Sequence, residues 1–246
     1  IRMKTLVIIP SRLSATRLPG KPLLKINGLS IISHVVKKAK EANIGEVLVA
    51  TEDTEIIEDV KNNGGDAILT SNHHKTGTDR IYEALQKCNE SNIELIMNLQ
   101  GDEPLMDVED IKNLHKQMIK TKSKIGTLAS NILKNDVLEA ENIVKVITKK
   151  NLDNFEFPEA LNFSRKLTSE IKNTFHHLGI YCYQLETLKT FISLEQSKNE
   201  IRNNLEQLRA LDNNININVA LAKSSPIGVD TEEDFMAIKK IMEYKL

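Results

Sequence analysis

Short apolar runs, rich in β-branched residues, alternate with longer amphipathic stretches over the first half of the chain. The runs lie at 5–9, 46–50, 67–69, 93–99, 126–130 and 143–148, and the stretches with helical spacing lie at 31–42, 54–63, 78–88 and 108–119. This alternation is typical of βαβ units around a mostly parallel sheet. The sequence therefore predicts an α/β fold.

The second half of the chain is less regular. Residues 151–174 carry clustered Phe and Pro, which is typical of an insertion or a small lobe. Regular spacing then returns, and it predicts strands at 178–183 and 215–220, helices at 186–191 and 203–211, and a last helix after Asp230. No internal repeat or interdomain linker is visible in the sequence. We therefore expect residues 1–246 to form a single domain.

The charge balance excludes some partners. With 33 basic and 34 acidic residues among 246, the net charge is −1, so the chain has no global electrostatic footprint for nucleic acid. Any bound polyanion must be held by a local cluster of cations. The first apolar run stops at Pro10 and is followed by Arg12, which fits neither a signal peptide nor a membrane span. We therefore expect a soluble, cytoplasmic protein.

The segment 10–22 is the most informative part of the chain. It follows the first predicted strand and carries Arg12, Arg17 and Lys21. Open α/β sheets bind ligands at the carboxyl ends of their strands, and three convergent cations suit a polyphosphate. Gly20 and the prolines limit the shapes that the loop can adopt. A basic surface loop without a ligand is the alternative on spacing alone.

Two familiar phosphate-binding loops do not fit this segment. A Walker loop needs Gly where this chain has Ala15, and Ser or Thr where it has Pro22. No G-x-G-x-x-G pattern follows a predicted strand, so we expect no dinucleotide cofactor.

The segment 9–23 resembles the signature of the cytidylyltransferases that activate sugar acids, specifically those that act on 3-deoxy-manno-octulosonate (Kdo). Further matches occur in the family's order and extend the resemblance from residue 5 to residue 235. They are TGTDR at 76–80, NLQGDEP at 98–104, HLGIY at 177–181, LEQLR at 205–209 and GVDT at 228–231.

This resemblance implies a fold and an activity. The implied fold is a Rossmann-like nucleotide-diphospho-sugar transferase fold, with a mostly parallel sheet, helices on both faces and a small lobe over the sugar pocket. That lobe would lie within about 150–215 and would also serve dimerisation in a homodimer. The implied reaction is Mg²⁺-dependent transfer of CMP from CTP to Kdo, giving CMP-Kdo and pyrophosphate for lipopolysaccharide biosynthesis.

Other functions stay open at this point. The acceptor could be another sugar acid, such as a sialic acid or an amino-substituted Kdo. A different class of function, a nucleotide-binding or carbohydrate-binding module, would keep the fold without catalysis.

Two carboxylates from distant parts of the chain suit a magnesium ion. Asp102 follows a predicted strand and Asp230 precedes the last helix, and Mg²⁺ prefers few carboxylates together with waters and phosphate oxygens. The resemblance implies both ligands. Read without it, Asp102 could form a turn, Asp230 could support a helix start with Thr231, and Glu103 competes as a ligand.

The resemblance also implies the remaining site residues. The implied catalytic residues are Arg12, Lys21, Asp102 and Asp230, and the implied nucleotide-binding residues are Ser11, Arg12, Arg17, Lys21, Thr76, Gly77, Arg80 and Gln100. The implied sugar-binding residues are Gln100, Arg165, His177, Tyr181, Glu206 and Gln207. His177 and Tyr181 lie four apart on a predicted strand and so share one face; without the resemblance they would pass as core residues. The adjacent His73 and His74 point in different directions on any regular element, and no acidic residue or Cys is spaced to complete a zinc site with them.

Overall fold

The computed structural model describes residues 3–14, 17–134, 136–169 and 171–244. Segment 10–22 is called the phosphate loop below, after the ligand that its cations predict, and its Ala15 lies outside the described residues. The chain divides into two compact units, the first made of residues 1–108 and 226–246 and the second of residues 109–225. No helix in the described ranges is long and apolar enough to cross a membrane.

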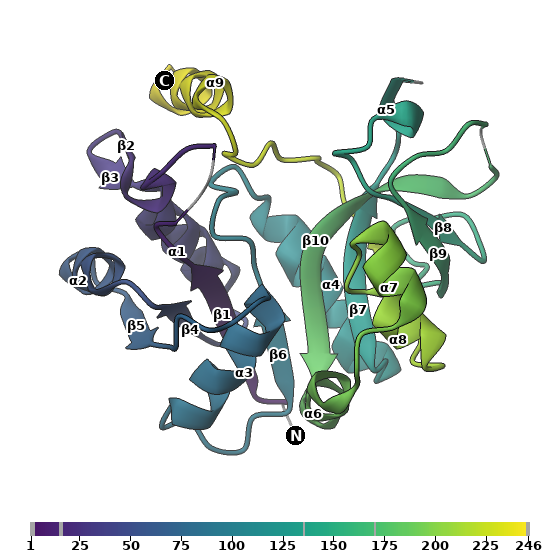
Figure 1. Cartoon of the computed structure of the whole chain (residues 1–246), viewed down its shortest axis with the longest axis horizontal. Helices are drawn as coiled ribbons and strands as arrows, with labels where there is room; N and C mark the ends of the chain where they lie inside the picture. Colours follow the sequence, from purple (N-terminus) through teal and green to yellow (C-terminus); the bar gives the residue numbers. More distant parts are fainter. Residues whose placement is uncertain (1–2, 15–16, 135, 170, 245–246) are drawn as a thin grey trace. The chain divides into compact units, whose positions relative to one another are not determined.

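The first unit contains four parallel strands in the order β6-β1-β4-β5 (Figure 1). A two-stranded hairpin, β2–β3, stands apart from them. The strands are β1 Thr5–Ser11, β2 Lys25–Ile26, β3 Leu29–Ser30, β4 Glu46–Thr51, β5 Asp66–Leu69 and β6 Leu95–Asn98. The parallel sheet confirms the predicted α/β fold.

The helices of the first unit lie close to where the spacing predicts them. They are α1 Ile31–Ala42, α2 Thr54–Asn62, α3 Gly77–Lys87 and α9 Glu232–Glu243, with a short 3₁₀ helix at Lys21–Leu23. In α1 the hydroxyl of Ser30 accepts a hydrogen bond from the backbone N–H of Ser33, and the helix ends at Asn43 in the left-handed conformation. Local capping therefore sets both ends of this helix.

The order of connections places a crevice beside β1. The chain moves outward through α1 to β4 and through α2 to β5, and α3 then brings it back to β6 on the other side of β1. Right-handed crossovers put α1 and α2 on one face of this sheet and α3 on the other. Open α/β sheets bind ligands where the direction reverses, at the carboxyl ends of the strands. In this unit that point lies between β1 and β6.

Strand β1 is buried along almost its whole length. Leu6, Ile8 and Ile9 are at most 1% exposed, and burying each such side chain contributes about 1.5–3 kcal/mol to folding. A run that is apolar on both faces is expected for a central parallel strand covered by helices on both sides. The loop that follows therefore starts from a rigid base.

The last helix, α9, packs beside the β2–β3 hairpin (Figure 1). Ile26, Ile31, Val229 and Ile238 form a buried cluster there. Thr231 caps α9 in a capping box with Asp234, as the sequence suggests. This packing holds residues 226–230 in the same unit as the phosphate loop, although they are far from it in sequence.

The second unit combines parallel and antiparallel strands. β7 pairs in parallel with β11 and antiparallel with β10, and β8 pairs antiparallel with β10 and β9. Its strands are β7 Ile125–Ser130, β8 Lys145–Thr148, β9 Ala160–Ser164, β10 Thr174–Gln184 and β11 Ile217–Leu221. Its helices are α4 Val108–Thr121, α5 Asp136–Glu139, α6 Leu185–Ser193, α7 Lys198–Asn203 and α8 Leu208–Asp212.

Two predictions for the second unit are wrong. The helix expected at 203–211 is two short helices, because Asn204 adopts a left-handed conformation with φ 50° and ends α7. The irregular region 151–174 contains the strand β9, which the sequence analysis missed. β9 alternates weakly in polarity and has exposed Leu161 and Asn162, so its pattern did not stand out.

Candidate active site

A cavity of about 460 Å³ opens in the first unit, lined from the carboxyl ends of β1 and β6 and from the start of α3. It brings together all the residues of this unit that the resemblance implies for catalysis and nucleotide binding. These are Ser11, Arg12, Arg17, Lys21, Thr76, Gly77, Arg80, Gln100, Asp102 and Asp230. Their individual roles stay predictions.

The phosphate loop is held by a carboxylate that the sequence analysis missed. The backbone N–H of Leu13 donates to Oδ2 of Asp53 at 2.7 Å, and the N–H of Gly20 donates to the carbonyl of Leu13 at 3.0 Å. Asp53 is the N-cap of α2, yet its side chain makes no capping bond. Gly20 has φ 71°, a conformation that glycine adopts without strain. Nothing in the sequence around Asp53 indicates that its carboxylate accepts a hydrogen bond from Leu13.

Two glycines allow the backbone to converge at the cavity. A Cβ atom on Gly101 would lie 2.9 Å from the carbonyl oxygen of Pro10, and one on Gly77 would lie 3.3 Å from the Pro10 ring. These approaches join the turn after β6 and the start of α3 to the end of β1. Because Gly77 and Gly101 have no Cβ atom, their backbone can approach Pro10 this closely.

The charges that line the cavity are mostly positive. Five cationic side chains face two carboxylates, the cations being Arg12, Arg17, Lys21, Lys75 and Arg80. Nζ of Lys21 lies 3.2 Å from Oδ2 of Asp102, and Arg17 donates to Oδ2 of Asp230 at 2.6 Å. The Arg17–Asp230 pair is exposed, and such a pair contributes little to stability, so Arg17 can turn to an anionic ligand at little cost. The arrangement suits a polyphosphate.

The segments that carry the two candidate metal ligands, Asp102 and Asp230, are joined by a backbone hydrogen bond. The backbone N–H of Val229 donates to the carbonyl of Asp102 at 2.8 Å, which ties the segment before α9 to the turn after β6. Asp102 and Asp230 both line the cavity, whereas Glu103 does not. Burial, and then the charge of Asp102, raise the pKa of Glu103 to about 8. Asp102 is therefore better placed than Glu103 to meet a cation in the cavity.

The donor set fits magnesium. Within the described ranges no group of three or more His, Cys, Asp or Glu side chains is arranged to hold a metal. Two carboxylates beside a cationic loop would suit Mg²⁺, because Mg²⁺ keeps waters and takes phosphate oxygens as further ligands. A zinc or calcium site would need a fuller set of protein ligands.

The wall formed by residues 70–80 rests on a buried arginine. Arg80 donates to Oγ1 of Thr70 at 2.6 Å and to the carbonyl of Ser71 at 3.2 Å, and it lies 3.7 Å from Oε2 of Glu52. Thr76 caps α3 by accepting from the N–H of Asp79. His74, which the sequence analysis considered only as a metal ligand, also lines the cavity.

In the second unit, His177 and Tyr181 share one face, as predicted. Their ring centroids are 5.6 Å apart, and His177 meets Phe163 edge to face at 4.9 Å. A β-bulge separates them on β10, and the hydroxyl of Thr127 lies 2.9 Å from Nε2 of His177 and donates to the Ile180 carbonyl. Burial, and then the charge of His176, lower the pKa of His177 to about 3, so this ring is neutral.

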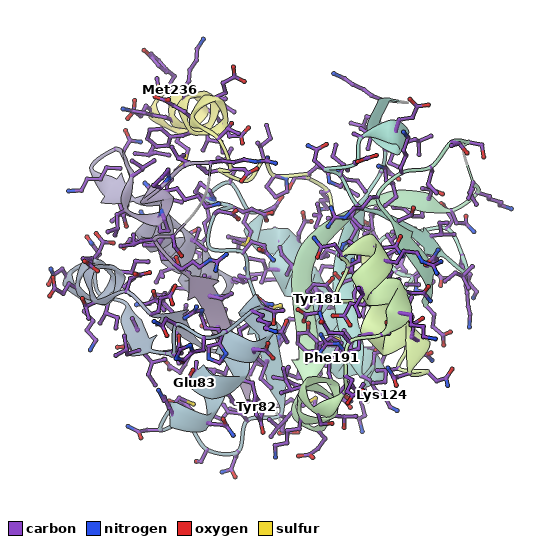
Figure 2. All side chains as sticks on the ribbon, viewed as in Figure 1. Tyr82, Glu83, Lys124, Tyr181, Phe191 and Met236 are labelled. Carbon is purple, nitrogen blue, oxygen red and sulfur yellow. The ribbon has the colours of Figure 1, made fainter. Side chains whose placement is uncertain are left out.

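Three more predicted sugar-binding residues, Arg165, Glu206 and Gln207, belong to this unit, whereas Gln100 lines the cavity of the first unit. Burial, and then the charge of Glu206, raise the pKa of Tyr181, which is labelled in Figure 2. Gln207 follows at the start of α8. Arg165 donates to the carbonyls of Asn203 and Asn204 at 3.0 and 2.8 Å. It therefore fixes the end of α7, and part of its hydrogen-bonding capacity is already used.

Comparison with known proteins identifies the family. Residues 6–217 match the family model described as cytidylyltransferase. The chain belongs to the cytidylyltransferase family. It is 40% identical over 241 residues to the 3-deoxy-manno-octulosonate cytidylyltransferase of Afipia carboxidovorans, covering 97% of this chain and 96% of that one. It is 42% identical to the protein of the same name from Thermodesulfovibrio yellowstonii, covering 98% of both chains.

Solved structures agree with this membership. The structure of CMP:2-keto-3-deoxy-manno-octonic acid synthetase complexed with CTP matches with a TM-score of 0.89 and 34% identity, covering 99% of this cytidylyltransferase and 100% of that chain. The 4-diphosphocytidyl-2C-methyl-D-erythritol synthase of Anaerococcus prevotii matches at 13% identity with a TM-score of 0.67, which is a likeness of fold alone. The predicted Rossmann-like nucleotidyltransferase fold is confirmed.

Proposed function

We propose that this cytidylyltransferase transfers CMP from CTP to Kdo and releases pyrophosphate. The observation that carries the proposal is the cationic cavity where the strand order reverses, lined by every nucleotide-binding residue implied by the resemblance. The full-length relatives at about 40% identity carry the name of this activity, and the structural neighbour was solved with CTP.

In the proposed reaction, the anomeric hydroxyl oxygen of Kdo forms a bond to the α-phosphorus of CTP. The bond from that phosphorus to the bridging oxygen breaks, pyrophosphate leaves with the electron pair, and the proton of the hydroxyl is released to water. Such a displacement depends on positioning and charge neutralisation rather than on a covalent enzyme intermediate. Arg12 and Lys21 offset charge on the α-phosphate and the leaving group, and Arg17 holds the outer phosphates.

Asp102 and Asp230 are the residues that would hold Mg²⁺. When bound, the ion would neutralise phosphate charge and polarise the oxygens that it contacts. The chain's own part is to present both carboxylates to the cavity, through the Val229 to Asp102 hydrogen bond and the packing of α9. Lys21 and Arg17, which pair with these carboxylates in the structure, then turn to the phosphates.

The sugar-binding residues of the second unit would hold the acceptor. Neutral His177, the phenol of Tyr181, Glu206 and Gln207 offer donors and acceptors for sugar hydroxyls, and Arg165 offers a cation for the carboxylate. We also propose that the enzyme is a homodimer that acts in the cytoplasm and supplies lipopolysaccharide biosynthesis. These parts of the proposal rest on the resemblance.

The proposal is tested by incubating the protein with CTP, Mg²⁺ and a panel of sugar acids, and detecting CMP-sugars by mass spectrometry. We expect CMP-Kdo as the main product. A sialic acid or an amino-substituted Kdo as the preferred acceptor would replace Kdo in the proposal. Tight CTP binding in calorimetry without product from any acid would indicate a binding module instead.

A further inference from the structure

Three hydrogen-bond donors converge on one carboxylate behind the nucleotide cavity. Glu83 lies on α3 (Figure 2), and its Oε2 accepts from the backbone N–H of Ser71 at 2.9 Å and also contacts Nε2 of His74. Its Oε1 lies 2.5 Å from Nζ of Lys87. Burial opposes ionisation of Glu83, but the bonds from Lys87, His74 and Ser71 outweigh it and lower the pKa to about 2. The carboxylate is therefore charged at neutral pH.

These bonds hold an irregular segment in place. Residues 70–76 connect β5 to α3 and belong to no strand or helix, so they have no regular ladder of hydrogen bonds. Glu83 holds the N–H of Ser71, while Arg80 holds the carbonyl of the same residue. His74, Lys75, Thr76 and Gly77, which follow, all line the cavity. Glu83 itself does not line it.

The contact with Glu83 also fixes the state of the His74 ring. An ionised carboxylate accepts hydrogen bonds only, so Nε2 of His74 must carry the proton and donate it. Nδ1 is then the ring atom left for a ligand, in a side chain that is 19% exposed and forms part of the cavity wall. A carboxylate that orients a histidine in this way sets both its direction and its hydrogen-bonding role.

Building on the proposed function, we propose that Glu83 is a positioning residue for CTP and that His74 contacts the bound nucleotide through Nδ1. Glu83 fixes residues 71–76 as one wall of the pocket and orients the His74 ring. Neither residue takes part in bond making or breaking. The pair therefore acts on nucleotide binding and leaves the chemical step unchanged.

The chain offers a matched control for this inference. Lys87 bonds the same carboxylate through the other oxygen, but it lies one turn further along α3, and its side chain is 49% exposed. Replacing Lys87 with Met removes an ion pair of Glu83 and a hydrogen bond to the carbonyl of Leu69, and leaves the bonds from Ser71 and His74 to Glu83 in place. If Glu83 only stabilised this part of α3, the variants would differ in unfolding free energy, and neither would change the CTP affinity of the folded protein.

The experiment measures pyrophosphate release at varied CTP and varied Kdo, together with CTP affinity by calorimetry. Glu83→Gln should raise KM and Kd for CTP about tenfold, the loss expected for a hydrogen bond to a charged group. Its kcat and its KM for Kdo should stay within about twofold of wild type, as should every constant of Lys87→Met. Unchanged CTP affinity in Glu83→Gln, or an equal loss in Lys87→Met, would overturn the inference.

A second variant, at His74, tests the inference even if Glu83→Gln folds poorly. His74→Asn should weaken CTP binding about tenfold, and the loss in the double variant should be smaller than the product of the two single losses, because Glu83 acts in part through His74. Losses that multiply in the double variant, or normal CTP affinity in His74→Asn, would contradict it. Wild-type protein that binds CTP but makes no CMP-sugar would refute the proposed function alone, because the calorimetric comparison of the variants would still apply.

Discussion

Four carboxylates position the loops and the charges of the cavity. Asp53 and Glu83 each accept hydrogen bonds from loop backbone, and Asp102 and Asp230 face the cations of the phosphate loop. The resemblance to the family, together with the three cations of segment 10–22, predicted most of the charged and polar residues that line the cavity. It did not predict the two carboxylates that hold its loops, because their partners are backbone N–H groups whose proximity only the folded chain creates.

Removing the charge of Asp102 should stop the reaction. Asp102→Asn keeps the side chain's size but weakens a proposed magnesium ligand, so we expect kcat/KM to fall at least about a hundredfold, comparable to losing one key electrostatic contact. Steady-state pyrophosphate release measures this. Asp66→Asn, an exposed change on β5, serves as the control and should keep full activity. Near-native turnover of Asp102→Asn would refute the metal role.

Adding a methyl group at Gly101 should disturb the base of the loop. The new Cβ would lie 2.9 Å from the Pro10 carbonyl oxygen, and such overpacking costs about 1–3 kcal/mol. Gly101→Ala should therefore unfold at lower temperature or denaturant than wild type. Gly77→Ala, whose Cβ would meet only the Pro10 ring at 3.3 Å, should lose less. Equal stability of Gly101→Ala and wild type would argue against this close approach.

At the scale of elements, left-handed cap residues and buried ion pairs set helix boundaries that the apolar pattern does not predict. The spacing placed α1 and β4 well, because continuous apolar stripes identify their buried faces. It failed at residues 203–211, where the left-handed Asn204 and the pair of Glu200 with Arg209 shape two short helices. The apolar pattern continues across that break, so only local backbone geometry and tertiary contacts separate the helices.

Breaking the buried pair between α7 and α8 should destabilise the protein strongly. Arg209 donates to both oxygens of Glu200, and the side chains are only 8% and 4% exposed. Arg209→Met would leave a buried carboxylate unpaired, which costs about 3–5 kcal/mol. Denaturant unfolding measures the loss. Replacing Glu200 with Met as well should recover most of it, and a double variant as unstable as the single one would contradict this explanation.

The same pair predicts the direction of a pH dependence. Burial opposes ionisation of Glu200, but bonds from Arg209, Ser197 and Gln196 outweigh it and lower its pKa below 4.5. Because the folded pKa lies below the unfolded one, this stabilisation is present above about pH 4.5 and is lost as the pH falls through the folded pKa. Unfolding at pH 3–7 should show a smaller acid loss in Glu200→Met/Arg209→Met than in wild type. An equal loss of unfolding free energy at low pH in the double variant and in wild type would contradict this role of Glu200.

On the scale of the whole molecule, a nearly neutral chain concentrates positive charge in one cavity. The net charge of −1 predicted that any polyanion must be bound locally, and the first unit does gather five cations around a single cavity. The alternation of strands and helices also predicted the α/β class. The boundary between the two units at residues 108 and 226 has no mark in composition, because it follows tertiary contacts.

Local charge implies a salt dependence. Raising the ionic strength from about 0.1 M to 1 M shortens the Debye length from about 10 Å to about 3 Å, which screens the attraction of the exposed loop cations for a triphosphate. We expect KM for CTP to rise severalfold at constant Mg²⁺, with a smaller change in KM for the singly charged Kdo. Equal changes in both constants would contradict a cavity built for the polyanion.

The most direct measurement is a crystal structure of this protein with CTP. The account predicts the triphosphate in the cavity of the first unit, against Arg12, Arg17 and Lys21, with Asp102 and Asp230 on its metal-binding side. Nucleotide bound elsewhere, or an empty cavity at saturating CTP, would contradict it.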